Sequence, residues 1–235
     1  MRGLAINVGA NTNEPGFRGP LFPDGTFEYI PIPESEPTAE PVPTYADLPL
    51  ETDVSDVADR RVHFDPEFPE VGGERYTYGD EHGVKAGPIS ALSAGDYLFF
   101  YATLSTVGDG PDWAPPEWGA FVVGHFRLAR EPVTGEAYRT LSPEERAPFA
   151  SNAHVKRDPF DARVLVLGSS GDSRLYDTAV PLSDPSGGTD ANWLVTDCSS
   201  DSGSGPWWRR PMRFDGSGTR TLLDAVDGPP SAIVE

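Results

Sequence analysis

Glycine and proline interrupt this chain so often that long helices are excluded over most of its length. The 235 residues include 25 glycines and 25 prolines, and both residue types favour turns and irregular connections. We therefore expect short strands and short helices joined by long loops, in an α+β or mostly-β fold. Because no internal repeat or domain boundary is visible, we predict a single domain over residues 1–235.

Two apolar runs stand out from this turn-rich background. They are "GDYLFFYATL" at residues 95–104 and "WGAFVVGHFRLA" at residues 118–129, and we predict two strands lying side by side. Along the first strand Tyr97, Phe99 and Tyr101 share one face. These rings either fill the core or wall a slot in which a base stacks, with Tyr101 as the candidate contact.

Shorter elements carry their own signals. Ser142 as N-cap, Pro143 in the first turn and Glu145 three residues on predict the start of a helix with a capping box. A second helix start is expected in "SSGDSRLYDTAV", residues 169–180, where Asp172 or Ser173 would be the cap and the helix N-terminus is a possible phosphate site. Further elements are predicted as strands at 4–9 and 163–168, a helical turn near 88–93 and a terminal helix at 219–226.

Residues 34–58 are rich in Pro, Glu and Asp and predict a solvated surface loop, with at most a helical turn near 45–48. The preceding segment "FEYIPI" has an extended pattern. Its prolines, Pro31 and Pro33, cannot donate hydrogen bonds to a sheet, so we place this segment at an edge or outside the sheet.

The charge is strongly negative, with 37 acidic against 18 basic residues and a net charge of -19. Such a balance ordinarily opposes binding to nucleic acid. Only two of the basic residues are lysines, Lys85 and Lys156. An acidic, lysine-poor chain is typical of a salt-in halophile such as a halophilic archaeon, in which molar salt shortens the Debye length to about 3 Å and acidity serves solubility. The alternative is an acidic mesophilic protein that avoids polyanions.

Several classes of function have no support in the sequence. There is no GxxxxGK[ST], GxSxG or HExxH motif, and the four histidines are not spaced as metal ligands. The single cysteine, Cys198, excludes an intramolecular disulfide and a Cys-rich zinc site. We therefore expect no metal and no cofactor. No signal-peptide pattern and no apolar run near the length of a membrane span is visible, so we expect a soluble cytoplasmic protein without a membrane partner.

Two blocks offer acid–base chemistry. "HFDPEF" contributes His63 and Asp65, and "YTYGDE" contributes Tyr78 and Asp80. If the blocks converge, His63 with Asp65 or Asp80 makes a general base with an orienting carboxylate. The alternative is that both aspartates are only turn-forming residues beside Pro66 and Gly79.

The block "SNAHVKR" places Asn152 and His154 two residues apart, so an extended backbone would aim both side chains the same way. An amide and an imidazole read a base edge or position a reactive water. The alternative is that Asn152 caps the C-terminus of the preceding helix and His154 is polar surface. Lys156, followed by Arg157, is a candidate phosphate contact.

The N-terminal block supplies Asn7, Asn11 and Arg18, whose amide and guanidinium groups bind base edges or phosphate with directional hydrogen bonds. Arg18 serves equally well in a structural ion pair. Further candidates for stacking or phosphate contact are Arg174, Trp207, Trp208, Arg209 and Arg210.

Two resemblances add to this reading. "SAGDYLFFYATL…FVVGHFRLA" resembles the barrel segment of PUA-like domains, which include the EVE and ASCH modules, and implies a partly closed, mixed or antiparallel β-barrel. The blocks "INVGANT…GFRGPLFPDGTFEYIPIPE", "HFDPEF", "YTYGDE", "GDYLFFYATL", "SNAHVKR" and "SRLYDTAVPLS", in this order, resemble the third type of nucleotide modification associated domain. That family is described as DNA base hypermodification proteins, so the resemblance implies nucleic acid or a modified nucleotide as partner.

Three functional hypotheses follow. The first is a module that binds a modified base in an aromatic-walled pocket. The second is a transferase or hydrolase acting on a modified nucleotide, with His63, Asp65, Asp80 and His154 as acid–base residues. The third is a structural or interaction domain whose aromatic residues are all core. The base, the choice between DNA and RNA and the oligomeric state stay open at this point.

Overall fold

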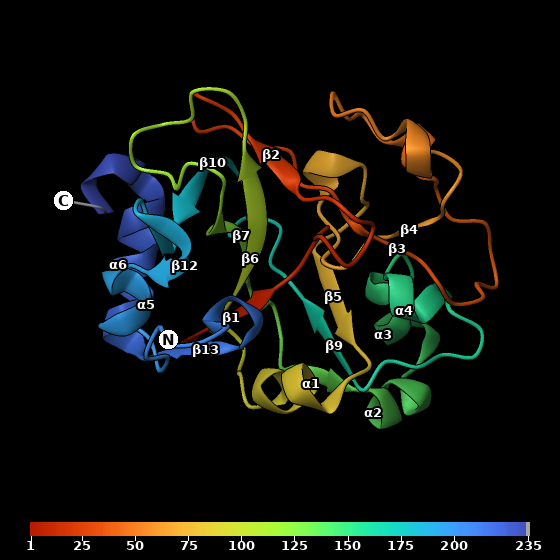
Figure 1. Cartoon of the computed structure of the whole chain (residues 1–235). Helices are drawn as coiled ribbons and strands as arrows, with labels where there is room; N and C mark the ends of the chain where they lie inside the picture. The colour runs from red at the N-terminus through yellow and green to blue at the C-terminus, as the bar shows by residue number, and fades with distance from the viewer. Residues whose placement is uncertain (234–235) are drawn as a thin grey trace. The chain divides into compact units, whose positions relative to one another are not determined.

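The computed structural model describes residues 1–233 and has an α+β fold built from short elements (Figure 1). The chain forms two compact units, each assembled from segments that are distant in sequence. Unit 1 comprises residues 1–30, 97–125 and the chain from Leu175 onward, and unit 2 comprises residues 31–96 and 126–174. The α+β class agrees with the sequence-based expectation, whereas the single domain over 1–235 stays a prediction.

Unit 1 is organised around a six-stranded mixed sheet with the order β10-β7-β6-β1-β13, in which β2 also pairs with β6. Its strands are β1 (Gly3–Asn7), β2 (Gly19–Leu21), β6 (Tyr97–Thr106), β7 (Trp118–Arg127), β10 (Arg174–Pro181) and β13 (Met212–Phe214). The two apolar runs form β6 and β7, which are neighbours as predicted. β1 runs parallel to β6, with Ala5 opposite Phe99, and antiparallel to β13.

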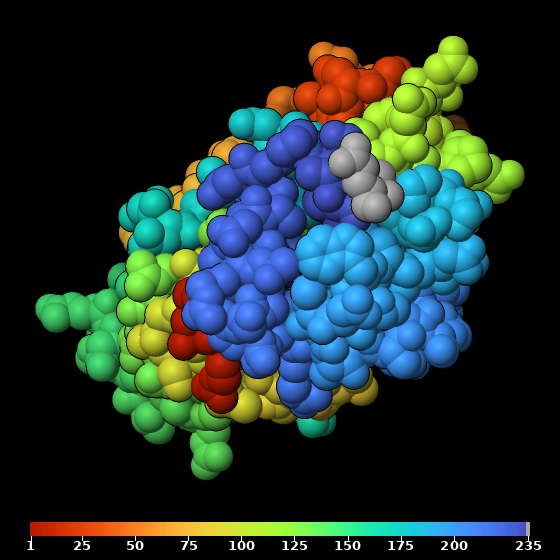
Figure 2. Space-filling view, turned by 90° about the vertical axis from the view of Figure 1, so that its left-hand side faces the viewer, coloured from red at the N-terminus to blue at the C-terminus, as the bar shows by residue number. Residues whose placement is uncertain are grey.

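The remaining elements of unit 1 follow the sheet towards the C-terminus. They are β11 (Ser183–Asp184), β12 (Gly187–Ala191), α5 (Trp193–Thr196), the 3-10 turn η5 (Trp207–Arg209), α6 (Gly216–Asp227) and η6 (Pro230–Ile233). α5 and α6 pack together, and Figure 2 shows the continuous surface that these C-terminal segments form, drawn in blue. α6 confirms the predicted terminal helix, and Asp215 caps it through bonds from the Ser217 and Gly218 amides.

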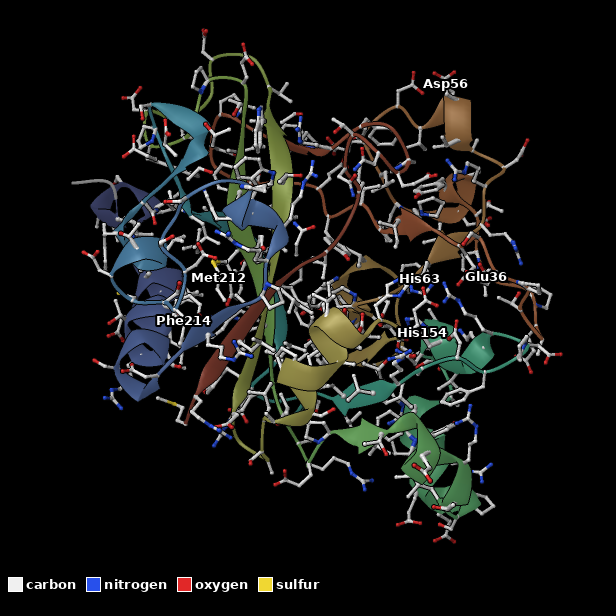
Figure 3. All side chains as sticks on the ribbon, turned by 60° about the horizontal axis from the view of Figure 1, so that its bottom comes forward. Glu36, Asp56, His63, His154, Met212 and Phe214 are labelled. Atoms are coloured by element: carbon white, nitrogen blue, oxygen red, sulfur yellow. The ribbon has the colours of Figure 1, made fainter. Side chains whose placement is uncertain are left out.

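Tyr101 lies inside the core of unit 1, which corrects its assignment as a stacking surface. The side chain has 0% relative exposure and packs with Phe99, Met212 and Phe214, the last two on β13 (Figure 3). Its hydroxyl donates a hydrogen bond to the Arg210 carbonyl at 2.8 Å. Because neither face of the ring is exposed, no base can stack on it without opening the core.

The barrel expected from the PUA-like resemblance is also absent from residues 1–233. The six-stranded sheet is an open path that ends at β10 and β13, and none of the smaller sheets closes on itself. Closure into a barrel would need the edge strands β10 and β13 to pair, and the order of the sheet contains no such pairing.

Unit 2 contains two small sheets and four short helices. β5 (Thr77–Asp80), β9 (Val164–Leu167) and β8 (Val133–Thr134) form an antiparallel sheet, and β3 (Ile32–Pro33) pairs with β4 (Val62–His63). The helices are α1 (Gly83–Ser90), α2 (Gly135–Thr140), α3 (Pro143–Arg146) and α4 (Ala153–Lys156), with 3-10 turns η1 (Tyr45–Asp47), η2 (Ser55–Val57), η3 (Pro69–Val71) and η4 (Ala147–Phe149). Phe149, Leu165 and their neighbours form its apolar core.

Two local predictions for unit 2 are confirmed. α3 begins with the predicted capping box between Ser142 and Glu145, and the helical turn predicted in the acidic loop is η1. Glu34 is an exception to the solvated surface loop predicted for residues 34–58, because its relative exposure is only 7%.

The helix predicted at 169–180 is wrong, because this segment forms β10. Pairing with β7 outweighs the local capping signals, and Tyr176 and Val180, four residues apart along the strand, are buried in the same core cluster. Asp172 instead accepts hydrogen bonds from Arg127 and Ser169. The phosphate site expected at this helix N-terminus therefore has no structural basis.

Within residues 1–233, no helix has both the length and the apolar character that crossing a bilayer requires.

Candidate functional site

Unit 2 brings three of the four predicted catalytic residues together. His63 ends β4, Asp65 follows two residues later, and His154 lies in α4. One ligand-type atom from each of the three lies within 4.8 Å of the others. The two imidazole rings meet edge to face with centroids 4.9 Å apart (Figure 3). We call these three residues the histidine–aspartate cluster; its side chains are buried, with 4–5% exposure.

Asp65 is held so that one carboxylate oxygen faces both rings. Its Oδ1 accepts hydrogen bonds from the Gly79 amide at 2.7 Å and from Asn152 Nδ2 at 3.2 Å. Its Oδ2 lies 3.4 Å from His154 Nε2 and 3.9 Å from His63 Nε2. The carboxylate is therefore fixed on one side and available on the other.

Each histidine is oriented from behind by a second carboxylate. His63 Nδ1 lies 2.6 Å from Glu34 Oε2, and His154 Nδ1 lies 2.8 Å from Asp161 Oδ1. A carboxylate on one ring nitrogen fixes the ring's orientation and selects the role of the other nitrogen. Both rings consequently present Nε2 towards Asp65.

Arg157 links the outer carboxylates. Its Nη1 lies 2.6 Å from Glu81 Oε2 and 2.7 Å from Asp161 Oδ2, and its Nη2 lies 3.0 Å from Glu34 Oε1. The side chains of Glu81 and Asp161 are 32% and 27% exposed, so solvent reaches this edge of the network while the centre is closed.

The contacts shift the protonation equilibria of the network. Burial alone would raise the pKa of Glu34, but hydrogen bonds from His63 and Arg157 outweigh it and lower that pKa to about 2. Burial alone would lower the pKa of His154, but its bonds to Asp161 and Asp65 raise that pKa to about 9.

Asp80, the fourth predicted catalytic residue, adjoins the cluster without joining it. Its carboxylate is buried and accepts a hydrogen bond from the His82 amide at 3.1 Å. Burial raises the pKa of Asp80, against the attraction of Lys85, and burial lowers the pKa of Lys85. Asp80 and Lys85 form a charge pair beside the cluster, since each also interacts electrostatically with Asp65.

Two local features explain how the sequence builds this arrangement. A Cβ atom at Gly79 would lie 2.7 Å from His154 Cδ2 and 3.0 Å from Asn152 Oδ1, so only glycine permits this close approach of β5 and α4. Asn152 caps the N-terminus of α4 by accepting a bond from the His154 amide at 3.1 Å. The predictions of an extended backbone here and of a C-terminal cap are both wrong.

Unit 1 holds a separate polar cavity of about 170 Å³. We call it the arginine cavity; its lining residues are Asn7, Asn11, Thr12, Asn13, Arg18, Thr103, Trp208 and Arg209. It gathers the predicted nucleotide contacts of the N-terminal block with the tryptophan and arginine of η5. None of its lining residues is acidic.

Arg18 is held in the arginine cavity by an aromatic surface and not by a carboxylate. Its guanidinium carbon lies 4.4 Å from the centroid of the Trp118 ring. The Arg18 Nε atom is buried without a hydrogen-bond partner among residues 1–233. Burial lowers the pKa of Arg18. A buried guanidinium donor without an acceptor is unfavourable.

The aromatic side of the arginine cavity is anchored by neighbouring tryptophans. Trp207 is fully buried and its Nε1 donates to the Thr189 carbonyl at 2.8 Å. Trp208 packs edge to face on Trp118 at 5.5 Å and on Trp207 at 6.0 Å. These contacts hold Trp208 half-buried at the cavity.

Three other predicted contacts belong neither to the histidine–aspartate cluster nor to the lining of the arginine cavity. Tyr78 is buried on β5, at 3% exposure, and Arg174 is exposed at the start of β10. Lys156 is half-buried and lines a cavity of about 480 Å³ in unit 2 together with Tyr138, Arg146 and other residues.

Sequence reasoning missed the residues that support the histidine–aspartate cluster. Glu34 lies in a proline-rich segment typical of solvent, Asp161 in a turn seven residues after His154, and Arg157 drew notice only as a neighbour of Lys156. The one usable signal was the "HVKR" block, in which a histidine and an arginine three residues apart share a helix face.

Fold and sites together define an α+β protein with a polar cavity that two arginines line and a buried cluster of histidine and aspartate side chains. The model of nucleotide modification associated domain 3 matches residues 2–224, and the chain therefore belongs to this family. No curated protein and no solved structure matches the chain.

Proposed function

We propose that this protein binds a nucleotide during nucleotide modification, and that the arginine cavity is the binding site. Family membership indicates a role in nucleotide modification, and the proposal adds the residues and the chemistry. One observation carries it: in a chain with 37 acidic residues and a net charge of -19, the cavity is lined by two arginines and no carboxylate. Such a local reversal of charge attracts an anion.

The lining residues divide among the parts of a nucleotide. Arg18 and Arg209 bind phosphate, because guanidinium groups match phosphate oxygens in geometry and charge. Trp208 offers a half-buried ring for a base, and the Asn7 and Asn11 amides supply donors and acceptors for a base edge. The cavity is smaller than the ~300–1,000 Å³ typical of pockets that enclose a whole ligand. One part of the nucleotide therefore enters and the rest stays outside, as for a modified base presented by a DNA base hypermodification system.

Calorimetric titration with deoxynucleoside 5′-monophosphates and with the matching nucleosides tests this proposal. We expect the monophosphates to bind and the nucleosides to bind more weakly, and Arg18→Ala to weaken monophosphate binding about 10–100-fold through loss of a charge-assisted bond. Arg213→Ala, on the exposed face of β13, removes the same charge from unit 1 and is expected to change nothing. Equal losses in the two variants would show that only net charge matters and would refute the assignment.

A second candidate function, an enzyme acting on the nucleotide, is favoured by the carboxylates behind His63 and His154. Histidines oriented in this way serve as general acid and general base in transferases and hydrolases. We expect Asp65→Asn to abolish conversion of modified deoxynucleotides or oligonucleotides, followed by mass spectrometry of the nucleosides, while nucleotide binding survives. His82→Ala, a change at an exposed histidine, is the matched control.

The remaining hypothesis is a structural or interaction domain without a ligand. It predicts that wild-type protein binds no nucleotide and converts none under the same conditions. The aromatic residues of β6 fit that hypothesis because they are core, but an unpaired Arg18 Nε is a cost that a purely structural domain has no reason to keep.

A further inference from the structure

We propose that His63, Asp65 and His154 bind a divalent transition-metal ion, with His63 Nε2, His154 Nε2 and Asp65 Oδ2 as ligands. Neither the family nor the sequence assigns a metal to this chain. The proposal is independent of nucleotide binding, because it concerns unit 2 alone and rests on contacts among its own residues.

The separations of the ligand atoms suit an ion. Zinc-type ions bind nitrogen and oxygen at about 2.0–2.2 Å, which places two ligand atoms of a tetrahedral site about 3.4 Å apart. His154 Nε2 and Asp65 Oδ2 are 3.4 Å apart, and His63 Nε2 and the same oxygen are 3.9 Å apart. The second distance is too long for a hydrogen bond. The ligand-type atoms of the three residues all lie within 4.8 Å of one another, so an ion between them would bind all three after the side chains draw closer to it.

The atoms that would not touch the ion are all occupied by outer partners. Glu34 holds His63 Nδ1 and Asp161 holds His154 Nδ1. Gly79 and Asn152 hold Asp65 Oδ1. Carboxylates behind ligating histidines and hydrogen bonds behind ligating carboxylates are the usual support of metal sites. A network built only for stability has no need to direct three such groups towards one point.

A second group, formed by Glu81, His154 and Asp161, also has metal-ligating atoms within 4.8 Å of one another. Its centre already contains a cation, since Arg157 Nη1 lies 2.6 Å from Glu81, 2.7 Å from Asp161 and 3.3 Å from His154 Nδ1. This comparison separates the two groups. The guanidinium fills the outer group, and the inner group is the one left for an ion.

The ligand set indicates which ions bind. Two imidazoles and one carboxylate suit Zn²⁺ or Fe²⁺, whereas Mg²⁺ and Ca²⁺ prefer oxygen ligands. Three protein ligands also leave at least one coordination position for water or substrate, as in catalytic sites. The sequence could not show this, because the ligands are 2 and 89 residues apart and follow no metal-binding spacing.

Titration of chelator-treated full-length protein with Co²⁺ as a spectroscopic probe tests the proposal. We expect one equivalent to bind with the visible absorption of a nitrogen–oxygen site, to be displaced by Zn²⁺ and to be unaffected by Mg²⁺. Absence of Co²⁺ and Zn²⁺ binding by the folded wild-type protein would overturn the proposal without bearing on nucleotide binding at the arginine cavity.

Variants locate the ion. His63→Ala is expected to abolish Co²⁺ binding, and His82→Ala, which removes an exposed histidine from the same unit, to leave it intact. If circular dichroism shows that His63→Ala does not fold, Asp161→Asn provides the second test. Asp161 is not a proposed ligand, but its loss releases the His154 ring, and we expect Co²⁺ binding to weaken about 10–100-fold. Unchanged affinity in Asp161→Asn, or an equal loss in His82→Ala, would refute this site.

Discussion

The two candidate sites differ in how they hold an arginine side chain. Arg157 of unit 2 contacts Glu34, Glu81 and Asp161 within 3.0 Å. Burial alone would lower the pKa of Arg157, but Glu34 and Asp161 outweigh it and raise that pKa. Arg18 of unit 1 lies on the Trp118 ring, has an unpaired Nε, and its pKa is lowered by burial. The first guanidinium has its charge balanced inside the protein, and the second does not.

This difference indicates that one arginine positions other side chains and the other is available to a ligand. A charge that is fully paired within the chain positions other groups, because it has nothing left to offer a ligand. A charge that is desolvated but unpaired is costly by itself and becomes favourable when a ligand supplies the acceptor. Arg157 therefore holds the outer carboxylates of the histidine–aspartate cluster, whereas binding by Arg18 is our proposal.

The largest expected effect is the difference in the free energy of unfolding between Arg157→Ala and Arg18→Ala. Arg157→Ala leaves the buried Glu34 carboxylate without its guanidinium, and we expect a loss of about 3–5 kcal/mol in the free energy of unfolding. Arg18→Ala breaks no ion pair with the protein and loses only its contact with Trp118, about 0.5–1 kcal/mol. Urea unfolding followed by circular dichroism measures both. Comparable losses in the two variants would remove the distinction drawn between them.

The next effect concerns the close approach of β5 and α4. Gly79→Ala places a methyl group 2.7 Å from His154 Cδ2, and we expect a loss of about 1–3 kcal/mol from overpacking. The matched control is Gly87→Ala in α1, where an added Cβ meets nothing within 4 Å and alanine favours the helix by about 1 kcal/mol. Thermal unfolding should therefore shift in opposite directions. A neutral Gly79→Ala would mean that His154 moves aside without cost.

Much of the fold was predictable because its signals are local. The apolar runs that became β6 and β7 are continuous and rich in aromatic and β-branched residues, which is typical of buried strands. The capping box at Ser142 and Glu145 acts within one helical turn. The failure at residues 169–180 has the opposite cause. The capping signal of Asp172 is local, but the pairing of β10 with β7 is a long-range contact that no window of sequence contains.

The candidate sites were predictable only in part for the same reason. His63, Asp65 and His154 could be named from their chemistry, and their convergence depends on a sheet and a helix that bring residues 89 positions apart together. Glu34 could not be named, since a glutamate between prolines in an acidic segment is typical of solvent. The prediction that a base stacks on Tyr101 was wrong for a different reason. The alternation of side chains along a strand shows which of them share a face, but it does not show whether that face lies in the core or in a pocket.

A smaller effect tests the aromatic part of the arginine cavity. Trp208→Ala removes the half-buried ring, and we expect nucleoside monophosphates to bind about 1–3 kcal/mol more weakly because base stacking is lost. Binding of inorganic phosphate should not change, since Arg18 and Arg209 remain. Competition titrations with both ligands distinguish these cases. A parallel loss for phosphate would show that Trp208 only supports Arg18 through its contact with Trp118.

The smallest expected effect is that of salt on the free energy of unfolding, and it distinguishes buried from exposed charges. Raising KCl from 0.1 M to 1 M shortens the Debye length from about 10 Å to about 3 Å, which weakens repulsion among surface carboxylates of a chain with a net charge of -19. We expect the free energy of unfolding of the wild type to rise, because this repulsion opposes the compact state. The difference between wild type and Arg157→Ala should stay constant, because Arg157 and Glu34 are buried at 7% and 1% side-chain exposure and are poorly screened. Urea unfolding at both salt concentrations measures the two quantities. A difference that shrinks with salt would show that solvent screens the network around Arg157, and the contrast with Arg18 would then rest on binding alone.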